Sequence, residues 1–235
     1  MYHERLDGPS PSLDAIQPVV MTCARDTSLM RMFVESYARR IADALPPPLA
    51  SVDLTAAVTL PGDYVSLLHR LGPAAVAIHP RLGDATDFES INDAAYAALD
   101  HGLNGLGRRE CLLFLEDDVV FSGRFIPFLA GVRLAPDAGL YTLYQPFGGY
   151  GSAVVPTRRF FGTQCLMMPK RAVEVVLEDR GKSSEWPTLT YDLRWARSLA
   201  RRGYKLYGSL ESYVQHVGGI SRYGSESHRS ETFVE

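Results

Sequence analysis

The chain has 235 residues, of which 46% are hydrophobic and 22% are charged, and its formal net charge is −3 at pH 7. This length suffices for one sizeable α/β domain or for two small ones. The negative net charge argues against a protein that binds nucleic acid or an anionic membrane through its overall charge. The three cysteines have no Cys-x-x-Cys spacing, so we expect free thiols rather than disulfides or zinc ligands.

Residues 1–17 are polar and contain Pro and Ser, and they have no apolar core like that of a signal peptide. No stretch of the chain approaches the roughly 20 apolar residues that a membrane-spanning helix needs. We therefore expect a flexible arm over residues 1–17 and a cytoplasmic protein without a transmembrane segment.

Beyond this arm, the first half of the chain alternates strand and helix patterns, which is typical of a parallel sheet covered by helices. The most apolar run, Cys111 to Leu115, predicts a central strand that is buried on both faces. The other predicted elements of this half are strands at 18–23, 52–60 and 74–78 and helices at 29–41, with Asp26 or Thr27 as N-cap, and at 91–99.

The second half of the chain is less regular. It predicts strands at 139–145, 161–168 and 204–207 and helices at 125–132, 169–177 and 191–202, the last with Thr190 as its N-cap. Residues 146–159 are rich in Gly and include Arg158 and Arg159, so they form either a lid that closes over a ligand or an ordinary surface loop. The basic run Arg194, Arg197, Arg201 and Arg202 is interpreted as a solvated helix face rather than as a binding patch.

Three acidic residues, Glu116, Asp117 and Asp118, directly follow the most apolar strand. In open α/β sheets, ligands bind beyond the carboxyl ends of the strands. Adjacent carboxylates repel one another, and Mg²⁺ or Mn²⁺, which also bind diphosphate oxygens, would remove that repulsion. The triplet therefore indicates a divalent metal between protein and diphosphate. Solvated acids at a strand end are the alternative, and the pattern does not separate sugar transfer from nucleotidyl or phosphoryl transfer.

The segment from Leu113 to Val119 resembles the acidic motif of GT-A glycosyltransferases in its Glu-Asp-Asp form. A late segment, Tyr213 to Gly218, is similar to the Gln-His-Ile-Gly-type segment of several such enzymes, including N-acetylglucosaminyltransferases of the complex-glycan branching type. The resemblance covers residues 18–224 and also involves Thr22–Arg25, Ile91–Asn92 and Phe161–Gln164. It implies an α/β fold: a single GT-A (Rossmann-like) domain with a central, mostly parallel mixed sheet flanked by helices.

The resemblance implies a role for each matching residue. Asp118 and His216 would ligate the metal, and Glu116 would contact the ribose or support the metal shell. Asp192, in the first turn of a predicted helix, would be the general base of an inverting enzyme, which must draw a proton from the acceptor hydroxyl. In a retaining enzyme it would lose that role. The implied nucleotide-sugar contacts are Thr22, Arg25, Asn92, Glu116, Asp117 and Gln164.

The resemblance thus implies a hexosyl- or N-acetylhexosaminyltransferase that uses a nucleotide-sugar, foremost a UDP-sugar, with Mn²⁺ or Mg²⁺. Its partners would be this donor and an acceptor: a glycan, a lipid-linked sugar, a protein side chain, a small metabolite or a modified DNA base, of which the net charge disfavours the last. The alternatives are a metal-dependent nucleotidyltransferase and a non-catalytic GT-A-like binding protein. The domain would have a nucleotide-binding half over 18–120 and an acceptor half over 121–224, followed by a polar tail over 225–235.

Overall fold

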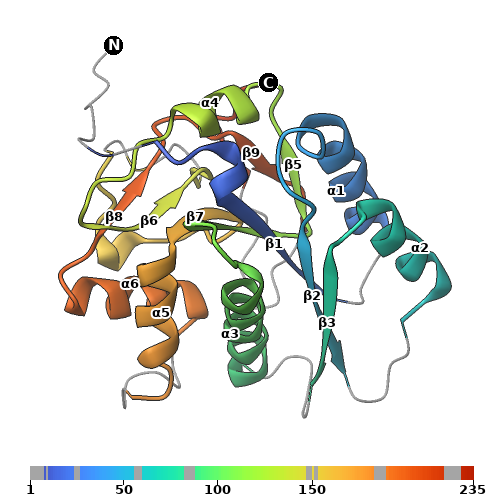
Figure 1. Cartoon of the computed structure of the whole chain (residues 1–235), viewed down its shortest axis with the longest axis horizontal. Helices are drawn as coiled ribbons and strands as arrows, with labels where there is room; N and C mark the ends of the chain where they lie inside the picture. Colours follow the sequence, from blue (N-terminus) through green and yellow to red (C-terminus); the bar gives the residue numbers. More distant parts are fainter. Residues whose placement is uncertain are drawn as a thin grey trace.

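A seven-stranded sheet lies at the centre of the computed structural model, with helices on both of its faces (Figure 1). The structure describes residues 8, 10–23, 27–55, 60–81, 88–146, 150, 153–182, 189–219 and 229–235. The chain is an α/β domain with a mixed, mostly parallel sheet, as the sequence predicts.

The strand order of the main sheet is β3-β2-β1-β4-β7-β6-β8. Only β7 runs antiparallel to its neighbours β4 and β6, and the other neighbouring pairs are parallel. A second, two-stranded antiparallel sheet joins β5 to β9. The strands are β1 Ile16–Cys23, β2 Leu49–Thr55, β3 Ala75–Arg81, β4 Cys111–Glu116, β5 Val119–Phe121, β6 Ala138–Thr142, β7 Cys165–Pro169, β8 Lys205–Gly208 and β9 Val214–His216.

Two apolar clusters, one on each face of the sheet, form the core. The first contains the buried side chains of α1 and α2, and the second contains those of α3, α5 and α6. Helix α3 packs so closely on β1 and β4 that a methyl group added at Gly102 would lie 2.8 Å from a Leu112 methyl carbon. The helices are α1 Thr27–Arg40, α2 Gly62–Leu71, α3 Phe88–Gly105, α4 Phe125–Gly131, α5 Lys170–Glu178 and α6 Tyr191–Arg201, with short 3-10 turns at Leu13–Ala15 and Thr157–Arg159.

The structure confirms the central strand and corrects several boundaries. Residues 111–115 are at most 3% exposed. Helix α2 lies between the predicted strands at 52–60 and 74–78, where the sequence pattern predicts no element. Pro61 precedes the first helical residue, and Tyr64, Leu67, Leu68 and Leu71 form the buried face of the helix. Strand β2 ends at Thr55, and residues 56–59 lie outside the described part. No helix among the described residues is long and apolar enough to cross a membrane.

The described end of the chain, residues 229–235, lies against the start of β9, where we expected only a polar tail. The amide of Ser212 donates to the carbonyl of Thr232, and the amide of Val234 donates to the carbonyl of Ser212. The side chain of Gln215 binds both the backbone amide and the carbonyl of Ser230. These contacts hold the segment beside the small β5–β9 sheet.

Candidate active site

The three acids after the central strand point to different partners. Glu116, the last residue of β4, accepts hydrogen bonds from the hydroxyls of Thr163 at 2.7 Å and Tyr191 at 2.6 Å. Asp117 accepts one from the hydroxyl of Thr22, and a carboxylate oxygen of Asp118 lies 3.2 Å from Nε2 of His216. Side chains from β1, β9, α6 and the segment before β7 therefore meet at this end of β4.

Glu116 has a strongly shifted acid–base equilibrium. Burial and, second, the negative charge of Asp118 raise the pKa of Glu116 to about 7, although the hydroxyls of Tyr191 and Thr163 and the charge of His216 act against this rise. Glu116 is therefore partly protonated at neutral pH. A cation beside Glu116 would lower its pKa again, because a positive charge favours the ionised form.

The small β5–β9 sheet brings Asp118 and His216 together, although they are 98 residues apart in the chain. Strand β5 starts directly after Asp118, and its first residue, Val119, pairs with His216. The amide of Val217 also donates to the backbone carbonyl of Asp118 at 2.8 Å. Asp118 is 5% and His216 is 4% exposed. The geometry thus places a carboxylate and an imidazole side by side.

The backbone of Gly218 lies close to this pair, and only a glycine fits there without displacing one of the two side chains. A methyl group added there would lie 2.7 Å from Nε2 of His216 and 2.8 Å from a carboxylate oxygen of Asp118. The described residues contain no group of three His, Cys, Asp or Glu side chains that could hold a metal ion. Asp118 and His216 therefore fit a metal that takes two protein ligands and completes its shell with diphosphate oxygens and water, as Mg²⁺ commonly does. Their role as metal ligands remains a prediction.

Replacing Gly218 with alanine is expected to weaken Mn²⁺ binding by about 10-fold or more, because the added methyl group would push His216 and Asp118 apart. Gly219→Ala is the matched control, since a methyl group added at Gly219 meets no atom within 4 Å. Isothermal titration with MnCl₂ measures the two affinities. Equal affinities in the two variants would mean that Asp118 and His216 do not share a metal.

Thr22 and Asp117 form a buried cluster with Tyr64 of α2. The hydroxyl of Thr22 is hydrogen-bonded to both Asp117 and Tyr64, and Thr22 and Asp117 are each 2% exposed. These bonds tie the ends of β1 and β4 to α2. The predicted nucleotide contacts of Thr22 and Asp117 remain predictions, and Arg25 lies outside the described residues. Tyr64 was missed by the sequence reasoning because α2 was missed.

Asn92 and Gln164, two predicted nucleotide-sugar contacts, lie in different settings. Asn92 is fully buried, and its amide donates to the backbone carbonyl of Leu189 at 3.0 Å. The backbone carbonyl of Gln164 accepts a hydrogen bond from the amide of Glu116. The buried Oε1 of Gln164 has no hydrogen-bond partner within the described part of the chain, so it can accept from a ligand. For both residues the contact with a nucleotide-sugar stays a prediction.

Asp192 lies in the first turn of α6, as predicted, and is 8% exposed. One carboxylate oxygen accepts from the hydroxyl of Thr190 and from the amide of Leu193. Thr190 occupies the N-cap position, but its hydroxyl binds Asp192 instead of a backbone amide of the helix. Burial raises the pKa of Asp192, although these two hydrogen bonds partly offset the rise. A carboxylate with a raised pKa is a better proton acceptor.

The basic run is a solvated face only in part. Arg201 is exposed, as expected, whereas Arg194 is 3% exposed and binds Glu89. Arg202 is half-exposed and forms ion pairs with Asp179 and Glu178. A count of positive charges does not reveal burial, because the acids that pair with these arginines lie elsewhere in the chain.

The loop over residues 146–159 is only partly described. The amide of Tyr150 donates to the side chain of Gln145, and the Tyr150 hydroxyl binds both the amide and the carbonyl of Phe161. Val154 forms a bridge with Tyr207 of β8. Arg158 is exposed. The described parts of the loop are therefore anchored on the body of the domain, and its role as a lid remains a prediction.

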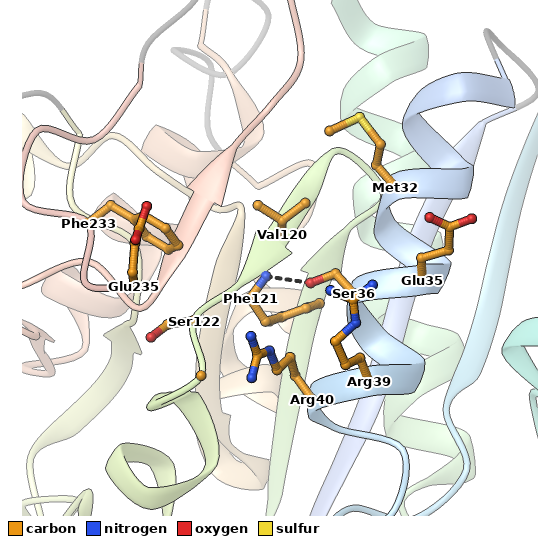
Figure 2. Close-up of a pocket in the computed structure, with 11 residues that line it drawn as sticks. Met32, Glu35, Ser36, Arg39, Arg40, Val120, Phe121, Ser122, Phe233 and Glu235 are labelled. Atoms are coloured by element: carbon orange, nitrogen blue, oxygen red, sulfur yellow. Dashed lines mark hydrogen bonds between the residues drawn. The ribbon is translucent and has the colours of Figure 1, made fainter.

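A cleft of about 420 Å³ lies between α1, β5 and the end of the chain (Figure 2). Within it the amide of Phe121 donates to the hydroxyl of Ser36 at 2.8 Å. The cleft shares no residue with the carboxylate site, and Glu35, Arg39 and Arg40 on its wall are surface groups of α1. Shifted acids and facing polar groups mark functional sites, so we place the candidate site at the carboxylates and not here.

No family model matches the chain, and no curated protein matches its sequence. Solved structures do share its fold. A glycosyltransferase involved in the glycosylation of the major capsid of PBCV-1 is 15% identical, with a TM-score of 0.50 over 88% of this chain and 95% of that one. A nucleoside-diphosphate-sugar pyrophosphorylase from Vibrio cholerae RC9 is also 15% identical, with a TM-score of 0.51 over 88% of this chain and 98% of that one. Identities this low show a common fold and nothing finer.

Proposed function

We propose that this protein is a metal-dependent glycosyltransferase that moves a hexosyl or N-acetylhexosaminyl group from a nucleotide-sugar, foremost a UDP-sugar, to an acceptor hydroxyl. The observation that carries the proposal is the buried pair of Asp118 and His216, closely approached by the backbone of Gly218, at the carboxyl end of the central strand. Two proteins of the same fold, by their descriptions a glycosyltransferase and a sugar-nucleotide pyrophosphorylase, support the choice of substrate class.

In this proposal, Asp118 and His216 hold Mn²⁺ or Mg²⁺ against the diphosphate. The metal supplies positive charge that stabilises the leaving nucleoside diphosphate. Glu116, oriented by the hydroxyls of Thr163 and Tyr191, contacts the ribose or supports the metal shell. Residues up to about 120 would bind the donor, and the later residues would bind the acceptor.

Asp192 is the proposed general base of an inverting reaction. The acceptor oxygen forms a bond to the anomeric carbon while the bond from that carbon to the diphosphate oxygen breaks. The nucleoside diphosphate leaves with the bonding electron pair, and the hydroxyl proton passes to the Asp192 carboxylate. Such a proton transfer accelerates a reaction by about 10²- to 10⁴-fold.

A panel of nucleotide-sugars, tested by thermal unfolding with and without Mn²⁺, examines the proposal. A ligand at 100 times its Kd adds about 2.7 kcal/mol to the free energy of unfolding. We therefore expect one nucleotide-sugar to raise the melting temperature by several degrees, and to do so only with Mn²⁺. No shift with any donor, under conditions in which the protein is folded, would contradict the proposal.

A nucleotidyltransferase is the second candidate, because the Vibrio cholerae structure is described as a sugar-nucleotide pyrophosphorylase. The sequence argues against it, since no Gly-rich, Lys-containing phosphate loop follows the first strand. The two functions differ in their products: a nucleotidyltransferase releases pyrophosphate from a nucleoside triphosphate, whereas a glycosyltransferase releases a nucleoside diphosphate. A coupled assay for each product separates them.

A further inference from the structure

The side chain of Arg194, in α6, is buried, and each of its three guanidinium nitrogens donates a hydrogen bond. Two of its guanidinium nitrogens donate to the two carboxylate oxygens of Glu89, at 2.9 and 2.7 Å. Its Nε donates to the backbone carbonyl of Leu189 at 2.9 Å. The planar guanidinium thus binds a carboxylate in bidentate fashion and a carbonyl at the same time, which a lysine ammonium cannot reproduce.

The carbonyl of Leu189 is held from a second side by α3. The side-chain amide of Asn92 donates to it at 3.0 Å. Glu89 and Asn92 both lie at the start of α3, on one face of the helix. The start of α3 therefore fixes Leu189, which lies just before the N-cap of α6. We call these contacts of Glu89, Asn92 and Arg194 the Leu189 clamp.

Tyr191, two residues after Leu189, reaches the candidate active site. The Tyr191 hydroxyl donates to Glu116 and lies 3.0 Å from the hydroxyl of Thr163. The Asp192 carboxylate is the proposed base. Both residues belong to the first turn of α6, and the amide of Arg194 closes this turn on the carbonyl of Thr190. A shift of Leu189 would therefore move Tyr191 and Asp192 together.

Stability alone does not account for a buried arginine at this position. The Glu89 side chain is 52% exposed, so solvent weakens its ion pair with Arg194 and the pair alone adds little stability. An apolar side chain could fill the space of Arg194 against α3, but it could not hold the Leu189 carbonyl in one direction. The directional contact, and not the burial, is what the arginine adds.

We propose that Glu89, Asn92 and Arg194 are positioning residues that fix the first turn of α6, and thereby set Tyr191 against Glu116 and orient the Asp192 carboxylate. The catalytic part of this inference rests on the proposed function, whereas the positioning part does not. A misplacement of about 1 Å at a reacting group can lower a rate by about 100-fold. Loss of the clamp should therefore lower kcat while donor binding at Asp118 and His216 stays intact.

The test compares Arg194→Lys with Arg201→Lys, which makes the same substitution at an exposed position in the last turn of the same helix. We expect Arg194→Lys to lower kcat by about 10- to 100-fold and to leave the donor KM within about 2-fold. Hydrogen exchange should become faster at the amide of residue 193, which donates to the Asp192 carboxylate, and at that of residue 194, which closes the first turn. Arg201→Lys should leave all three quantities unchanged.

Asn92→Ala is the second variant, because it removes one contact to Leu189 and leaves the ion pair of Arg194 in place. It should speed hydrogen exchange at residues 193 and 194 by less than Arg194→Lys does. Its donor KM does not test the clamp, because Asn92 is itself a predicted donor contact. Unchanged exchange at residues 193 and 194 in both variants would overturn the inference, and so would a parallel loss of kcat, donor binding and melting temperature in Arg194→Lys. If the wild-type protein turns over no nucleotide-sugar, the proposed function fails, and the exchange measurement alone still decides the positioning.

Discussion

Replacing Asp118 with alanine is expected to lower sugar transfer by about 10³-fold or more, because the variant loses the carboxylate that would hold the metal against the leaving diphosphate. Asp118→Asn should lose nearly as much, since an amide keeps the shape but not the charge. Glu110→Ala is the matched control: it removes an exposed acid just before the other end of the same strand, β4. Initial rates at saturating donor and Mn²⁺ measure the effect, and circular dichroism checks the fold.

The double variant with His216→Ala sharpens this experiment. If Asp118 and His216 share one metal, removing both should cost little more than removing either one, because residues that act as a unit are not additive. Losses that multiply would show that the two residues act separately. Full activity of Asp118→Ala would show that the site has been assigned to the wrong residue.

The sheet could be predicted because its strands are local apolar runs. Cys111–Leu115 stands out as the most apolar run, and it is indeed the central, doubly buried strand β4. Strands β5 and β9 could not be predicted in this way, because each has only three residues and they pair across most of the second half of the chain. A period of two residues is not visible in so short a strand.

The same limit applies to the site. The three adjacent acids at the end of β4 are visible in the sequence. Their different partners, Thr22, Thr163 and His216, are not, because these residues come from distant segments of the chain. The expectation that His216 lies near Asp118 came from the family resemblance, since the spacing of the two residues carries no such signal. Arg194 was misinterpreted for this reason too, because its partner Glu89 is 105 residues away. Charge can be read from a sequence, but the burial of a charge depends on its partner.

Replacing Asp192 with asparagine is expected to lower kcat by about 10²- to 10⁴-fold, because an amide cannot accept the proton of the acceptor hydroxyl. Donor binding should persist, since Asp118 and His216 are untouched. Asp100→Asn is a suitable control, because Asp100 is an exposed acid in α3 outside the candidate site. A wild-type rate for Asp192→Asn in a confirmed inverting reaction would remove Asp192 from the mechanism.

The same variant should be more stable than the wild-type protein at neutral pH. Burial raises the pKa of Asp192 in the folded state, so between the unfolded and folded pKa values the folded protein binds more protons than the unfolded chain. The stability of the wild-type protein therefore falls as the pH rises through this window, and above it the ionised, buried carboxylate is a net cost. Asparagine never ionises, so the advantage of Asp192→Asn should be full above the folded pKa and vanish below about pH 4, the unfolded pKa of aspartate.

Urea unfolding of both proteins between pH 4 and 8 measures this difference in stability. A variant that is less stable at every pH would mean that the hydrogen bonds from Thr190 and Leu193 outweigh the cost of burying the charge. A variant that gains stability while it loses turnover is the behaviour of a carboxylate kept for its chemistry at the expense of the fold.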